Sequence, residues 1–131
     1  MKFPLRVCIV DQQPVFRLGL RSFLEEEPDI RVVGEASSAS EAFGLVEQTR
    51  PDVVTLDSRL CDMSGIELAQ LLRKKWPELK ILMLSSYNFD QYIRDAARVG
   101  IVGYLLKDAC RAELAQMLRA VTAGAQVLWI G

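Results

Sequence analysis

The segment "LRVCIVDQQPVF", residues 5–16, indicates the fold and also raises the question of function. Its first six residues are rich in Val, Ile and Leu, a short apolar run typical of a buried β-strand. The carboxylate of Asp11 follows this run directly, and apolar residues with helical spacing begin at Phe16. Gln12 and Gln13 come next to Asp11, where a metal site would need more negative charge. The question is whether Asp11 belongs to a working acidic pocket or to the remnant of one.

Four further apolar runs repeat this pattern along the chain. They are "IRVVGEA" (30–36), "DVVTL" (52–56), "KILMLS" (80–85) and "VGYLL" (102–106). Segments in which apolar residues recur with helical spacing lie between the runs and after the last one. Two helix starts are marked by capping-box pairs, Ser38 with Glu41 and Ser64 with Glu67. Strand and helix therefore alternate five times.

This regular alternation predicts an α/β fold with a parallel sheet covered by helices on both faces. An α+β protein with clustered strands is the alternative. Half of the 131 residues are apolar, enough for the core of one domain. We expect that domain to span residues 1–124, with 125–131 as a linker or C-terminal tail whose apolar residues 127–130 pack on the domain or contact a partner.

The composition excludes several classes of function. Sixteen basic and 17 acidic residues give a net charge of -1, which provides no electrostatic case for binding nucleic acid or a membrane. The chain has no histidine, and its three cysteines lack C-x-x-C spacing, which argues against structural zinc and histidine-activated nucleophiles. The N-terminus resembles neither a signal peptide nor a membrane span, so we expect an intracellular, cytoplasmic protein.

Polar residues stand at four of the five predicted strand ends, where ligand sites lie in open parallel sheets. They are Asp11, Asp57, Ser85 and Lys107. Two carboxylates on neighbouring strands, roughly 5 Å apart, could share Mg²⁺. A carboxylate could accept a phosphoryl group, whose oxygens a lysine and a serine would bind. Each residue alone could simply turn the chain, cap a helix or face solvent, but together they indicate a pocket for phosphate and metal.

Four segments carry a resemblance to a known family: "VDQQPVFRLGLRSFLEEEPDIRVVGEA", "RPDVVTLDSRLCDMSGIEL", "ILMLSSY" and "GYLLKDA". From about Leu5 to Gly124 the chain resembles the receiver domain of bacterial two-component response regulators, most closely the NarL/FixJ type of the LuxR family. The resemblance implies a flavodoxin-like (CheY-like), doubly wound (βα)₅ fold with strand order 2-1-3-4-5. It also implies a phosphoacceptor rather than an enzyme, with autophosphorylation from small donors and autodephosphorylation as its own chemistry.

The resemblance assigns roles to individual residues. Asp57 would be phosphorylated by a histidine kinase, and Mg²⁺ would bind near Asp11, Asp57 and the main-chain carbonyl of Arg59. Ser85 and Lys107 match the hydroxyl and the lysine that contact the phosphoryl group. Tyr104 matches the aromatic residue that changes rotamer with the hydroxyl residue, which would alter the surface formed by the fourth helix, the fifth strand and the fifth helix.

The chain departs from the family pattern at four places near these residues, one of which is Gln13 in place of a common histidine. Gln12 replaces the second acid after the first strand, a direct metal ligand in the family, although its amide oxygen is still a candidate Mg²⁺ ligand. Cys61 replaces a proline, so we expect a less rigid loop, and Asp62 adds a carboxylate nearby. Cys61 as a redox switch is less favoured than Cys61 as a small loop residue. We therefore expect phosphorylation that is retained but needs more Mg²⁺ or turns over at a different rate.

Two alternatives concern the protein as a whole. An atypical pseudo-receiver would act as a protein-interaction module independent of phosphorylation. Family members normally continue into a helix-turn-helix domain, so we expect a fragment of a longer transcription factor that binds DNA only through that missing domain; a stand-alone receiver is the other possibility. A homodimer is a further candidate, and we expect no membrane contact.

Overall fold

The structure, a computed structural model, describes residues 4–109 and 111–124. Five strands and five helices alternate in the order β1 Leu5–Val10, α1 Pro14–Leu24, β2 Ile30–Ala36, α2 Ala39–Thr49, β3 Val53–Asp57, α3 Gly65–Lys75, β4 Lys80–Ser85, α4 Asp90–Arg98, β5 Gly103–Leu106 and α5 Arg111–Thr122. Strands β1, β2 and β4 have the predicted bounds. Strand β3 is shifted by one residue and therefore includes Asp57, and β5 begins one residue later than predicted.

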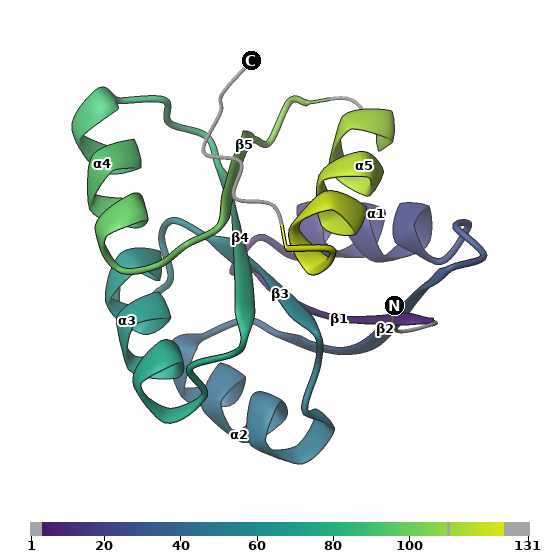
Figure 1. Ribbon diagram of the computed structural model, residues 1–131, viewed down its shortest axis with the longest axis horizontal. Helices are drawn as coiled ribbons and strands as arrows, with labels where there is room; N and C mark the ends of the chain where they lie inside the picture. The colour runs from purple at the N-terminus through teal and green to yellow at the C-terminus, as the bar shows by residue number, and fades with distance from the viewer. Residues whose placement is uncertain (1–3, 110, 125–131) are drawn as a thin grey trace.

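All five strands are parallel, in the order β2-β1-β3-β4-β5, which confirms the predicted topology and makes the α+β alternative wrong. Helices α1 and α5 cover one face of the sheet, and α2, α3 and α4 cover the other (Figure 1). Successive strand residues alternate between the two cores: Val7 and Ile9 pack under α1 and α5, whereas Cys8 and Val10 pack under the other helices. This double covering explains why the strands are apolar almost throughout.

The two predicted capping boxes form, each in a modified way. The hydroxyl of Ser38 accepts a hydrogen bond from the Glu41 N–H (3.2 Å), and that of Ser64 accepts one from the Glu67 N–H (3.1 Å). The carboxylate of Glu67 accepts the Ser64 hydroxyl proton, but that of Glu41 accepts from the N–H and hydroxyl of Ser37. These caps fix the starts of α2 and α3, the two helices that follow β2 and β3.

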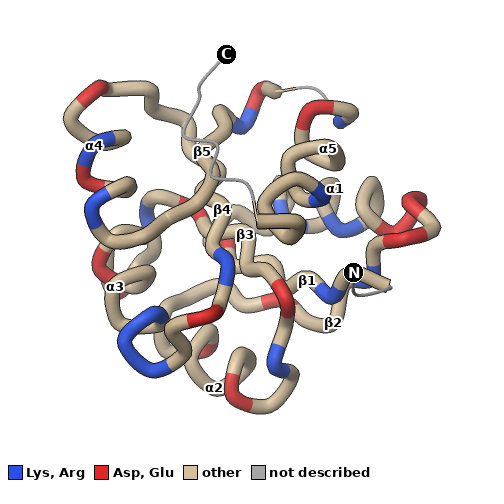
Figure 2. The backbone as a smooth tube through the Cα atoms, viewed as in Figure 1, with Lys and Arg blue, Asp and Glu red and all other residues tan. Residues whose placement is uncertain are grey.

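Acidic and basic residues are interspersed along the helices and loops, with a basic last turn in α3 (Figure 2). The helices in residues 4–109 and 111–124 do not have the length and hydropathy of a membrane span. The predicted tail, residues 125–131, lies outside the described part of the chain, so the domain boundary at 124 stays a prediction.

Candidate functional site

Three of the predicted residues meet at the carboxyl edge of the sheet. Asp11 follows β1, Asp57 ends β3 and Lys107 follows β5. The Lys107 ammonium lies 2.9 Å from Asp11 Oδ2 and 3.3 Å from Asp57 Oδ2, so it bridges the two carboxylates. Both aspartates are buried, with exposed fractions of 2% and 5%. The parallel sheet therefore assembles two acids and one base that lie up to 96 positions apart in the sequence.

Two carboxylates and one ammonium leave an excess of negative charge in this pocket. Burial and the neighbouring Asp11 carboxylate raise the pKa of Asp57, and Lys107 opposes this shift. The Arg59 N–H, 3.4 Å from Asp57 Oδ1, acts in the same direction as Lys107. A bound cation would favour the ionised form of Asp57.

The donor set suits Mg²⁺, which prefers oxygen ligands and commonly binds through one or two carboxylates while keeping several waters. Asp11 and Asp57 supply those carboxylates. Among the described residues no group of three His, Cys, Asp or Glu side chains could hold a metal. The remaining ligands would therefore be carbonyl, amide or water oxygens, and the roles of the Arg59 carbonyl and of the exposed Gln12 stay predictions.

Gln13 is a pocket residue that the sequence analysis did not assign. Its side-chain oxygen accepts a hydrogen bond from the Lys107 ammonium, and its backbone N–H donates to Asp11 Oδ1 (2.8 Å). The same ammonium lies 4.4 Å from the centre of the Phe16 ring. Nothing in the sequence distinguishes Gln13 from its neighbour Gln12, because the contact depends on where β5 delivers Lys107.

Ser85 and Tyr104 belong to a hydrogen-bonded chain beside the pocket. The fully buried Ser85 hydroxyl donates to the Ser58 hydroxyl (2.9 Å) and accepts from the Tyr87 N–H (3.0 Å). The Tyr104 hydroxyl donates to the Tyr87 carbonyl (2.6 Å), and burial raises the pKa of Tyr104. Ser58 was missed in the sequence analysis because its role depends on contact with a strand 27 residues away.

The carboxylate of Asp62, to which the sequence assigned no role, binds the start of a helix. It accepts hydrogen bonds from the N–H groups of Ala39 (2.9 Å) and Ser40 (3.0 Å), at the start of α2. These bonds lower the pKa of Asp62. This carboxylate, predicted only to lie near the pocket, therefore binds a helix N-terminus. Its neighbour Cys61 is exposed.

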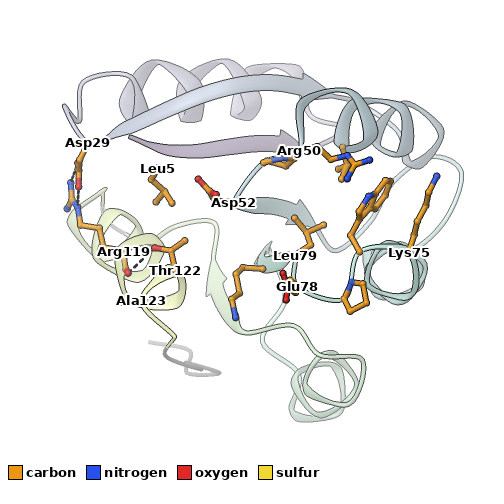
Figure 3. A pocket seen from close by; sticks show the side chains of 15 residues that line it. Leu5, Asp29, Arg50, Asp52, Lys75, Glu78, Leu79, Arg119, Thr122 and Ala123 are labelled. Carbon is orange, nitrogen blue, oxygen red and sulfur yellow. Dashed lines mark hydrogen bonds and ion pairs between the residues drawn. The ribbon is translucent and has the colours of Figure 1, made fainter. Parts of the chain in front are cut away.

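A cavity of about 650 Å³ lies at the opposite, amino-terminal edge of the sheet, lined in part by Leu5, Asp52 and Leu79 (Figure 3). Two of its charged residues already have partners. Arg119 forms an ion pair with Asp29 (2.7 Å). Lys75 forms one with Glu47, which lies outside the cavity (2.6 Å). Neither Asp11 nor Asp57 lines this cavity. The reactive groups thus favour the carboxyl edge as the functional site.

Comparison with known proteins gives a family match and similar curated proteins. The family model described as response regulator receiver domain matches residues 7–119. The DNA-binding transcriptional activator DevR/DosR of Mycobacterium tuberculosis is 43% identical over 95% of this chain and 57% of its own length. The transcriptional regulatory protein LiaR of Bacillus subtilis is 37% identical over 92% of this chain and 57% of its own. The chain thus spans little more than half the length of these curated relatives.

Solved structures agree with the family match. A LuxR-family two-component response regulator from Aurantimonas sp. SI85-9A1 has a TM-score of 0.89 and 34% identity, covering 93% of this chain and 87% of its own. The signal receiver domain of NarL from Mycobacterium tuberculosis has a TM-score of 0.89 and 30% identity, covering 94% and 99%. Both similarities extend over nearly the whole chain.

Proposed function

The chain belongs to the response regulator receiver domain family, with LuxR-family relatives, and on that premise we propose that Asp57 is its phosphoacceptor. The observation that carries the proposal is the contact of the Lys107 ammonium with both Asp11 and Asp57 at the carboxyl edge of the sheet. From the family we expect the phosphoryl donor to be a phosphohistidine of a histidine kinase. That histidine belongs to the partner, because this chain has none.

In the transfer, a carboxylate oxygen of Asp57 attacks phosphorus, a P–O bond forms and the P–N bond to the donor imidazole breaks. A carboxylate needs no general base for this attack, which suits a pocket without histidine. Lys107 then binds an oxygen of the transferred group as a point charge. The protein contributes position and charge neutralisation more than covalent chemistry.

Asp11 and Asp57 would hold Mg²⁺, with the Arg59 carbonyl and the Gln12 amide oxygen as further ligands. Bound there, the ion supplies positive charge that offsets the repulsion between the carboxylates and the incoming phosphoryl oxygens. Because Gln12 is neutral, the site carries one negative charge fewer than two adjacent acids would give. We therefore expect a higher Mg²⁺ requirement and a gain in affinity on Gln12→Asp.

The switch follows from the bonds of Ser85. To contact a phosphoryl group on Asp57, its hydroxyl must give up the bond that it donates to Ser58. That change moves the segment containing Tyr87, whose carbonyl accepts the bond from the Tyr104 hydroxyl. Phosphorylation thus shifts the population between two packings of the α4, β5 and α5 surface.

The relatives guide the proposal for the whole protein. DevR/DosR is named as a DNA-binding transcriptional activator, and this chain covers 57% of it. We propose a cytoplasmic regulator that controls transcription through a DNA-binding domain outside this chain and that can pair as a homodimer. The pseudo-receiver alternative has no support among the described residues, because Asp57, Ser85 and Lys107 are all in place.

The test is incubation with a small phosphodonor over a series of Mg²⁺ concentrations, followed by intact mass. We expect a single phosphoryl adduct that disappears in Asp57→Asn and forms at lower Mg²⁺ concentration in Gln12→Asp. An adduct that survives Asp57→Asn would place the phosphoacceptor elsewhere. No adduct in either the wild type or Gln12→Asp would refute the proposal.

A further inference from the structure

We propose that Asp62 is a positioning residue for the phosphoacceptor loop, defined as residues 58–64, and that it orients this loop beside Asp57 by anchoring it to α2. This inference depends on the proposed function in one respect, namely that the loop is positioned for phosphorylation of Asp57. Both carboxylate oxygens of Asp62 accept hydrogen bonds at the start of another helix, and no contact between Asp62 and the acidic pocket is found among the described residues.

The anchor pairs a negatively charged carboxylate with the free N–H groups at the start of α2. The first N–H groups of a helix have no partner within the helix, and the helix dipole favours a negative charge there. Asp62 Oδ1 accepts the N–H of Ala39 and Oδ2 that of Ser40. Bonds from an N–H to an ionised carboxylate are stronger than neutral ones. One side chain thus joins the loop after β3 to the helix after β2, 23 positions away.

The loop is short and internally bonded, so an anchor at its tip constrains its base. The Leu60 N–H donates to the Met63 carbonyl (3.1 Å), and Arg59 pairs with Ser64 in an isolated antiparallel bridge. At the base, the Gly65 N–H donates to the Ser58 carbonyl (2.9 Å). A displacement of the tip is therefore passed to the segment that contacts the phosphoacceptor.

That segment makes contacts that depend on the orientation of the loop. The Arg59 N–H reaches Asp57 Oδ1 over 3.4 Å, near the limit for a hydrogen bond, so a small shift would break the contact. The Ser58 hydroxyl accepts from Ser85, and the Ser58 carbonyl accepts from the Tyr92 hydroxyl of α4 (3.0 Å). Cys61, next to the anchor, cannot restrict the backbone as a proline would. The external bonds of Asp62 supply that restriction instead.

The test compares Asp62→Ala and Asp62→Asn with Ser38→Ala. Ser38 is the matched control because it caps the same helix, α2, but makes no bond to the phosphoacceptor loop among those described. Mg²⁺ affinity is measured by titration with MgCl₂, followed through the amide NMR signals of Asp57 and Arg59. Hydrogen exchange of the loop amides is measured in metal-free protein.

We expect Asp62→Ala to weaken Mg²⁺ binding by about tenfold, as losses outside the direct ligand shell commonly do. Asp62→Asn keeps one acceptor oxygen and should lie between Asp62→Ala and the wild type. Amides of the loop should exchange faster in Asp62→Ala, whereas Ser38→Ala should affect only the start of α2. Equal Mg²⁺ affinity and exchange in Asp62→Ala and the wild type, or the same weakening in Ser38→Ala, would overturn the inference. Because exchange is read without metal or phosphodonor, failure of the anchor is distinguishable from failure of phosphorylation.

Discussion

Substitution of Gly65 by alanine should destabilise the protein strongly, because the first residue of α3 lies against the backbone of the phosphoacceptor. A Cβ at Gly65 would lie 2.2 Å from the carbonyl oxygen of Asp57 and 3.0 Å from the Cα of Ser58. Close C···O contacts in proteins are about 3.3–3.6 Å, so β3 and α3 would have to separate by about 1 Å. Overpacking costs typically about 1–3 kcal/mol, and the upper part of this range applies because backbone cannot rotate away.

The free energy of unfolding should therefore fall by about 2–3 kcal/mol, which corresponds to a fall in Tm of about 10 °C for a domain of this size. Gly44→Ala and Gly19→Ala are matched controls. Both glycines lie within helices and have open space where the new Cβ would be. The free energy of unfolding of these two variants should therefore rise by about 0.5–1 kcal/mol. Thermal and urea unfolding of the three variants measures the difference. If Gly65→Ala were as stable as the wild type, the close approach of α3 to Asp57 would be refuted.

Three further predictions concern single side chains. Thr55→Val should raise the free energy of unfolding by about 1 kcal/mol in urea titrations, because the buried Thr55 hydroxyl has no partner among the described residues; a loss of stability would indicate a partner. Asp57→Asn should raise Tm at neutral pH in chelator-treated buffer, since burial and Asp11 raise the pKa of Asp57 and its charged form opposes folding. This gain should disappear as the pH falls below the unfolded carboxyl pKa of 3.8, and a gain that persists there would contradict the electrostatic cause. Lys107→Met should weaken phosphorylation while raising the pKa of Asp57, measured by NMR titration; an unchanged or lower pKa would contradict the role of the ammonium.

Local patterns in the sequence were sufficient to predict the strands and helices and to identify the principal pocket residues. Strands buried on both faces leave continuous apolar runs, and parallel strands necessarily bring Asp11, Asp57 and Lys107 to one edge. Bounds differed by one residue at β3 and β5 because strand ends depend on pairing with neighbouring strands.

Contacts between distant loops could not be predicted in the same way. Asp62 was expected near the pocket because it is close to Asp57 in sequence, but the free N–H groups of α2 bind its carboxylate. Ser58 and Gln13 meet their partners only after the sheet is assembled. These side chains are polar loop residues without a periodic pattern, so their partners follow from tertiary structure alone.

We propose that Asp57 accepts a phosphoryl group in a pocket shared with Asp11 and Lys107. The most direct test of this proposal is peptide mapping of the protein after treatment with a small phosphodonor and Mg²⁺. The predicted result is one phosphoryl group on Asp57, formed only when Mg²⁺ is present. Modification of a different residue, or an adduct on Asp57 that is independent of Mg²⁺, would contradict the claim.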